Sequence, residues 1–110
     1  MTTLTVVLIS RNQAWNIARL IESALKETAS MPGTEIILVD SASSDKTVEI
    51  ASQYPIRILR LHDTQRLSPS AGRFMGYKYT TGELILFVDG DNEMYPGWLE
   101  KAMKIFAENP

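Results

Sequence analysis

The chain has 110 residues, of which 45% are hydrophobic and 22% are charged, which is ordinary for one globular domain with its own core. The net charge of -2, from 11 basic and 13 acidic residues, excludes the basic stripe expected of a nucleic-acid-binding protein. The chain has no cysteine, which excludes disulfides and thiolate chemistry, and one histidine, His62, cannot form a zinc cluster by itself. Its apolar runs are strand-sized, so no membrane span is expected.

The first half of the chain predicts two strands that alternate with two helices. The β-branched run over residues 5–9 predicts a buried strand. Apolar residues then recur at helical spacing over residues 14–25, and Met31-Pro32-Gly33 ends this predicted helix. A second strand is expected over residues 35–39. The polar loop over residues 40–45 is rich in residues that cap helices, so a second helix should follow it.

The second half continues the alternation. Apolar and basic residues alternate over residues 56–61, which favours a third strand near a sheet edge. After a longer loop, Ser68-Pro69 is a typical start for a helix that runs to about residue 79. The apolar run over residues 84–88 predicts a fourth strand, and Pro96-Gly97-Trp98 opens a last helix. This alternation predicts an α/β fold with a mostly parallel sheet and helices on both faces.

The end of the chain bears on its domain organisation. Glu108-Asn109-Pro110 follows directly after the last helical pattern, where a further strand or a linker would be expected. The start of the chain carries no basic segment or cleavage site typical of a secretory signal. We therefore expect residues 1–110 to form a single domain that is truncated at its C-terminus.

The loops that follow the strands should share one edge of the sheet. In parallel α/β sheets, ligands bind outside the carboxyl ends of the strands, where these loops meet. Arg11, Asp40, Arg66 and Asp91 are each expected in or beside such a loop, although they are distant in the sequence. The sequence therefore predicts a binding site at this edge.

An acidic pair follows the fourth strand. Five apolar residues in a row suit a strand covered on both faces, and this run leads directly into Asp89-Gly90-Asp91. Two close carboxylates repel each other unless a cation or hydrogen-bond donors compensate, and hard oxygen ligands suit Mg²⁺ or Mn²⁺ shared with substrate phosphates. A polar turn is the alternative, since Asp, Gly and Asn are common turn formers. The sequence leaves both open.

Asp40 ends the second strand, where a carboxylate can accept a hydrogen bond from a ribose hydroxyl or from the N–H of a uracil-like base. The rest of that loop, Ser43, Ser44 and Asp45, is explained by helix capping alone. The first strand is followed by neither the glycine pattern of dinucleotide-binding folds nor the Walker sequence, so those two nucleotide sites are excluded.

Two arginines can bind a diphosphate, because the guanidinium group matches phosphate oxygens and stays charged. They are Arg66 in the longer loop and Arg73 in the predicted third helix, and the alternative for Arg73 is a solvated helix residue. His62 is expected at the surface rather than in catalysis. Trp15 and Trp98 are expected to pack rather than to stack on a ligand.

Four segments, residues 6–12, 35–47, 71–76 and 81–91, followed by Pro96, carry a family resemblance over nearly the whole chain. In this order and at this spacing they resemble the N-terminal, nucleotide-sugar-binding half of family 2 glycosyltransferases. The resemblance implies the Rossmann-like GT-A fold of nucleotide-diphospho-sugar transferases. It also implies a cytoplasmic location, at the inner face of the membrane in a full-length protein.

The resemblance implies an activity as well. Such an enzyme transfers a sugar from a nucleotide-diphosphate sugar, in most members a UDP-sugar, to an acceptor hydroxyl with inversion. It uses Mg²⁺ or Mn²⁺ to neutralise the diphosphate leaving group. The acceptor, whether a saccharide, a lipid or a protein, stays open, and the catalytic base is expected beyond Pro110 in the family's C-terminal half.

Roles for particular residues follow from the resemblance only. Asp40 would contact the nucleobase, Arg73 would lie near the pyrophosphate, Asp91 would coordinate the metal, and Asp89 would face ribose or metal. The implied substrate-binding residues are Ser10, Asn12, Asp40, Arg73 and Asp89. The implied metal ligands are Asp91 and Asp89.

The chain departs from the family pattern at three places. Arg11-Asn12 stands where many members have Tyr-Asn, Asp40-Ser41-Ala42-Ser43 stands for Asp-Asp-Gly-Ser, and Asn92 replaces a frequent acid. The nucleotide therefore stays open.

Two alternatives to the enzyme also remain. One is a non-catalytic nucleotide-sugar-binding fragment. The other is a haloacid-dehalogenase-like phosphatase with Asp89 as nucleophile, although Glu93 stands where that motif has Thr or Val.

Overall fold

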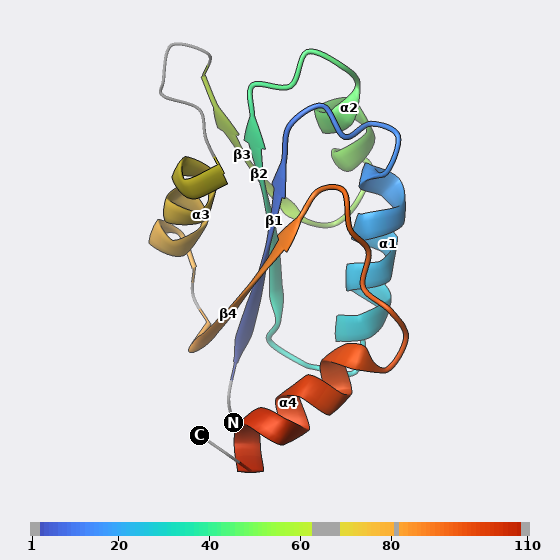
Figure 1. Ribbon diagram of the computed structural model, residues 1–110, viewed down its shortest axis with the longest axis vertical. Coiled ribbons are helices and arrows are strands. Elements are labelled where there is room, and N and C mark those ends of the chain that lie inside the picture. The colour runs from blue at the N-terminus through green and yellow to red at the C-terminus, as the bar shows by residue number, and fades with distance from the viewer. Residues whose placement is uncertain (1–2, 63–68, 81, 109–110) are drawn as a thin grey trace.

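A computed structural model describes residues 3–62, 69–80 and 82–108. Its strands form one parallel sheet in the order β3-β2-β1-β4, as Figure 1 shows. The strands are β1 (Leu4–Ser10), β2 (Glu35–Ser41), β3 (Arg57–Leu61) and β4 (Leu84–Asp89), and the helices are α1 (Ile17–Thr28), α2 (Thr47–Ala51), α3 (Pro69–Lys78) and α4 (Trp98–Glu108). The predicted alternation of strands and helices is confirmed.

Helices cover both faces of the sheet. In Figure 1, α3 lies on one side, whereas α1 and α2 lie on the other and α4 follows below α1. Successive side chains of a strand point to opposite faces, so β1 contributes side chains to the hydrophobic cores on both faces of the sheet. Val6 and Leu8 pack with α1, whereas Val7 and Ile9 pack on the side of α3. All of β1 is buried, because it has a strand on each side and helices on both faces.

The position of β4 differs from the prediction. Its apolar run was expected in a strand covered on both faces, but among the described strands β4 pairs with β1 only and is half-buried, with Phe87 38% exposed. The prediction was wrong because an apolar run shows that side chains avoid water, not which strand is central. β1 occupies that place. The edge position predicted for β3 is confirmed.

Element boundaries differ slightly from those expected. β2 continues through Asp40 to Ser41, and α1 begins at Ile17 rather than at Ala14, after a turn in which the Gln13 carbonyl accepts two backbone N–H groups. No helix within the described part of the chain is long and apolar enough to cross a membrane.

Two glycines bring α3 close to β1. A Cβ atom at Gly72 would lie 2.9 Å from Cγ2 of Ile9, and one at Gly76 would overlap a methyl group of Val7. Any larger residue would push the helix off the sheet. The glycines therefore fix the height of α3 above β1, and with it the position of Arg73 between them.

Candidate functional site

The predicted site residues gather at the carboxyl edge of the sheet. Ser10 pairs with Asp40 in the register of β1 and β2, and Ile9 pairs with Asp89 in that of β1 and β4. Asp40 and Asp89 therefore lie at the carboxyl ends of the two strands that flank β1, at the same edge of the sheet, toward the top of Figure 1. Arg66 lies outside the described residues.

Asp40 is a buried carboxylate with no exposed surface. Its Oδ1 accepts hydrogen bonds from the hydroxyls of Ser10 at 2.9 Å and Ser43 at 2.5 Å, and its Oδ2 accepts one from the Ser43 backbone N–H at 2.9 Å. A buried charge needs such donors, because it has lost its water. In this structure Asp40 organises its own loop, and Ser10 supports it.

Asn12 joins the loop after β1 to the loop after β2. It has φ of 54°, in the left-handed region that asparagine tolerates better than most residues. Its backbone N–H donates to the Ser43 hydroxyl at 2.8 Å, and its Oδ1 accepts from the backbone N–H groups of Ser44 at 2.8 Å and Asp45 at 3.3 Å. Asn12 thus holds the two loops together. The sequence does not show this role, because the partners of Asn12 are more than 30 residues away.

Asp45 adds a second link between these loops. Its carboxylate accepts hydrogen bonds from the backbone N–H and hydroxyl of Thr47 and, at 3.1 Å, from the N–H of Ala14. The Thr47 hydroxyl bond is the main cause that lowers the pKa of Asp45 below its usual value of 3.8, against a smaller raising effect of burial. The residue at the N-cap of α2 is Lys46, without a side-chain cap, and the side chains of Ser43 and Ser44 bond to Asp40 and Asn12. The predicted capping by Ser43 and Ser44 is therefore wrong, whereas Asp45 does accept the backbone N–H of Thr47, the first residue of α2.

Residues 89–92 form a tight turn, here called the acidic turn. The Asn92 N–H donates to the Asp89 carbonyl at 3.0 Å, and both carboxylates are exposed. Gly90 is buried, and a Cβ atom there would lie 2.9 Å from the Ile9 carbonyl oxygen. Only glycine fits this close approach to β1. The segment is thus a polar turn, and it also presents two carboxylates to solvent, so the two alternatives raised by the sequence are compatible.

Gln13 covers Gly90 from the loop after β1. Its Cγ would lie 2.8 Å from a Cβ at Gly90, and its Oε1 is buried without a hydrogen-bond partner among the described residues. Buried polar atoms are nearly always paired, so this oxygen is an exception. Sequence reasoning missed Gln13 because a glutamine in a loop carries no signal of its own.

Arg73 lies beside the acidic turn. Its Nη2 is 3.4 Å from Oδ1 of Asp89, and the two side chains are 43% and 53% exposed. Such exposed ion pairs contribute about 0–1 kcal/mol, so the guanidinium can exchange this partner for a phosphate at little cost. The structure thus brings together Arg73 of α3 and Asp89 of β4, which are 16 residues apart in the sequence.

The carboxylates suit one kind of metal site. No cluster of three or more acidic, histidine or cysteine side chains occurs within residues 3–62, 69–80 and 82–108. Mg²⁺ is commonly held by one or two carboxylates together with substrate phosphates, and Asp89 and Asp91 offer that donor set. They fit a divalent cation that arrives with a diphosphate, rather than a metal held by protein alone.

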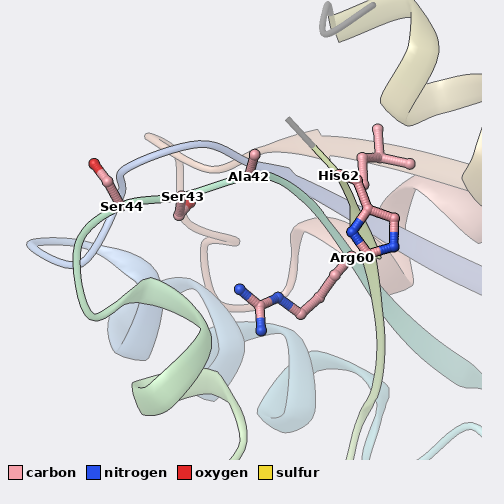
Figure 2. Close-up of a pocket in the computed structure, with 6 residues that line it drawn as sticks. Ala42, Ser43, Ser44, Arg60 and His62 are labelled. Atoms are coloured by element: carbon pink, nitrogen blue, oxygen red, sulfur yellow. The ribbon is translucent and has the colours of Figure 1, made fainter. Parts of the chain in front are cut away.

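A hollow of about 420 Å³ lies between the loop after β2 and the end of β3 (Figure 2). Its volume is within the usual range of small-molecule sites. The Arg60 guanidinium extends into this space, and His62 is exposed at its side, as predicted for a surface residue. The lining residues are Ala42, Ser43, Ser44, Arg60, Leu61 and His62. Arg60 pairs in register with Asp40, which the sequence could not show.

The tryptophans behave differently from the expectation. Trp15, in the turn before α1, is 69% exposed, so the prediction that it packs is wrong. Trp98 is 49% exposed and lines a groove between β4 and α4 with Leu86 and Phe106. Trp98 therefore packs in part.

Comparison with known proteins assigns the chain to a family. Residues 5–110 match the family model of glycosyl transferase family 2, and the chain belongs to that family. The resemblance found in the sequence is confirmed, and the phosphatase alternative loses its basis.

Among curated proteins, the chain is 33% identical to polypeptide N-acetylgalactosaminyltransferase 3 of Homo sapiens over 114 residues, which covers 97% of this chain and 18% of that protein. It is 29% identical over 108 residues to an uncharacterized glycosyltransferase of Haemophilus influenzae, covering 97% of this chain and 35% of that protein. The chain thus spans only a fraction of the length of these relatives.

Solved structures confirm the GT-A fold. TarS of S. aureus, residues 1–349, in complex with UDP-GlcNAc, has a TM-score of 0.85 and 26% identity, over 96% of this chain and 31% of that one. The mannosyltransferase PcManGT of Pyrobaculum calidifontis, in complex with GDP-Man and Mn²⁺, has a TM-score of 0.79 at 24% identity over 96% of this chain and 32% of that one, so it supports the fold alone.

Proposed function

We propose that this chain is the donor-binding domain of an inverting glycosyltransferase that uses a nucleotide-diphosphate sugar, most simply a UDP-sugar. The observation that carries the proposal is the meeting of Arg73, Asp89 and Asp91 with the loop of Asp40 at one edge of the sheet. The UDP-GlcNAc complex of TarS supports a uridine donor, because nearly the whole of this chain has the same fold as part of TarS.

The diphosphate would lie over the acidic turn. Asp91, with Asp89, would hold Mg²⁺ or Mn²⁺, and the cation would neutralise charge on the leaving diphosphate. Arg73 would turn from Asp89 toward a phosphate, since a guanidinium fork matches phosphate oxygens. Gln13, whose buried Oε1 has no partner among the described residues, would turn outward to accept a donor hydroxyl beside Gly90.

The nucleoside would lie against the loop of residues 40–45. Asp40 is held by Ser10 and Ser43 below the surface, so direct contact between its carboxylate and the base would need Ser43 to yield one hydrogen bond. The hollow beside Arg60 is the space that the base or ribose would use. Asn12 would act by holding this loop in place.

The transfer step needs a nucleophile and a base. The acceptor hydroxyl would attack the anomeric carbon from the face opposite the diphosphate, forming one C–O bond while the bond to the diphosphate breaks, which inverts the configuration. The hydroxyl proton would pass to a base beyond residue 110. The acceptor stays unassigned, and the cytoplasmic location implied by the resemblance stays a prediction.

A binding fragment without transferase activity is the second candidate. It is favoured by the small share of the relatives that this chain spans, 18% of the human enzyme and 31% of the TarS chain. Both candidates share the donor site. Release of UDP from UDP-GlcNAc separates them, because only a transferase or its slow hydrolytic side reaction releases the nucleotide.

Calorimetry with UDP in the presence and absence of Mn²⁺ tests the donor site. We expect Mn²⁺ to tighten UDP binding, and Asp91→Ala to weaken binding in Mn²⁺ about tenfold or more by removing a metal ligand. Glu83→Ala is the matched control, because it removes an exposed carboxylate just before β4, at the opposite edge of the sheet. Equal UDP affinity with and without Mn²⁺, or equal losses in both variants, would contradict the proposal.

A further inference from the structure

One face of α1 carries polar side chains at regular spacing. Asn16 is the N-cap residue of α1, and Ser23 and Glu27 follow it by 7 and 11 positions. At 3.6 residues per turn, positions with this spacing lie on one side of a helix. We call these three residues the tether face. Figure 1 shows the segment from β4 to α4 running along α1.

Each member of the tether face bonds to the backbone of that segment. Asn16 Nδ2 donates to the carbonyls of Gly90 at 2.9 Å and Asn92 at 2.7 Å. The Ser23 hydroxyl accepts from the N–H of Met94 at 2.9 Å. Glu27 accepts from the N–H groups of Gly97 and Leu99, each at 3.2 Å. The tether face thus fixes the backbone from the acidic turn to the start of α4.

Asn16 is the member that holds the acidic turn. It is 3% exposed, and its amide group donates to the carbonyls on either side of Asp91. Both partners can only accept, so the two donors of the NH₂ group fit there, whereas a hydroxyl has one proton to donate and a carboxylate has none. The backbone of Asp91 is therefore fixed on both sides while its carboxylate stays exposed.

Helix capping does not explain Asn16. It occupies the N-cap position of α1, where asparagine usually accepts a hydrogen bond from the helix, yet its side chain makes no such bond. Its amide is directed instead to a turn more than 70 residues further along the chain. The side chain therefore serves the acidic turn rather than its own helix.

We propose that Asn16 is a positioning residue for the metal and diphosphate site, an inference that rests on the proposed function. Its amide bonds to the backbone carbonyls of Gly90 and Asn92, so it would act through the position of Asp91. Asn16 holds the carbonyls on both sides of Asp91, and Gly90 packs against β1, so the turn is already ordered. The entropy cost of ordering the turn is therefore not paid when the cation binds. Loss of this support should weaken metal-dependent binding about tenfold or more, as loss of partners behind metal ligands does.

The test uses Asn16→Ser and Asn16→Asp. Serine is a good N-cap that keeps the start of α1 but is too short for the amide's two bonds, whereas aspartate keeps the size and places acceptors against two carbonyls. Ser23→Ala is the matched control, since it releases the same segment at Met94, away from the acidic turn. UDP affinity with and without Mn²⁺ and amide exchange of residues 89–92 are measured for each variant.

We expect both Asn16 variants to lose about tenfold or more of the Mn²⁺-dependent UDP affinity, to keep metal-free UDP affinity within about twofold, and to exchange faster at residues 89–92. Ser23→Ala should keep both affinities. If wild-type protein shows no Mn²⁺-dependent binding, the proposed function fails and the inference falls with it. If the wild type binds and the Asn16 variants bind equally well, or Ser23→Ala loses as much, the inference alone is overturned.

Discussion

Short polar side chains determine the shape of the paired loops after β1 and β2. Asp40, Asn12 and Asp45 each accept two or more hydrogen bonds, and each has at least one partner on the other strand or in the loop that follows it. Hydrogen bonds to charged acceptors are about twice as strong as neutral ones, so the two aspartates anchor this arrangement. These two loops are therefore fixed in shape before any ligand binds.

Asp45 gives this arrangement a pH dependence. Because the Thr47 hydroxyl bond lowers the pKa of folded Asp45 below the ordinary 3.8, ionised Asp45 stabilises the fold above pH 3.8. That stabilisation is lost as pH falls through the lowered folded value. Asp45→Asn should reduce the free energy of unfolding at pH 7 and have little effect below the folded pKa, as measured by urea unfolding at both pH values.

Thr47→Val is the matched variant for this measurement. It keeps the carboxylate of Asp45 but removes the hydroxyl that donates to it, in a buried side chain of almost the same shape. It should therefore flatten the dependence of stability on pH in the same acid range. A deficit of Asp45→Asn that is as large at acid pH as at pH 7 would contradict this origin.

At the scale of elements, α3 and β4 position the charged groups by close backbone approach. Gly72 and Gly76 seat α3 on β1, and Gly90 seats the acidic turn on the end of the same strand. Arg73 and Asp89 meet as a result. The elements that carry Arg73 and Asp89 are thus placed by glycines.

Gly76→Ala tests this close approach. An added methyl group would overlap Val7, so we expect a loss of about 1–3 kcal/mol in the free energy of unfolding, although alanine is the better helix former. Urea unfolding measures the loss. In a double-mutant cycle, Val7→Ala should make room and offset part of the cost. A more stable Gly76→Ala protein, or strictly additive effects, would show that α3 does not sit where its glycines place it.

At the scale of the whole molecule, local patterns predicted the elements but not their neighbours. Apolar run lengths and proline and glycine breaks were enough for the four strands and four helices. The sheet order was not accessible, because whether β1 or β4 is central depends on pairing between distant segments. The burial of β4 was therefore overestimated.

In the site, too, the sequence indicated residues with a local signal and missed those that depend on contacts between distant segments. Asp40 and Asp89 were singled out because each lies where an apolar strand ends, and Arg73 because a guanidinium group can bind a diphosphate and because the family resemblance implied that role. Asn16 was missed, because an asparagine before a helix is ordinarily a cap and only the folded chain brings it to the acidic turn. Its partners lie 74 and 76 residues away.

The most direct test of the donor site is a two-dimensional NMR titration of the protein with UDP and Mn²⁺, with Mg²⁺ as the diamagnetic reference. Because Mn²⁺ broadens nearby signals, the amides of residues 89–92 should disappear first, those of residues 10–13 next, and those of residues 31–35 at the far edge of the sheet should stay sharp. Strongest broadening away from the acidic turn, or no response to Mn²⁺ when UDP is present, would contradict the account.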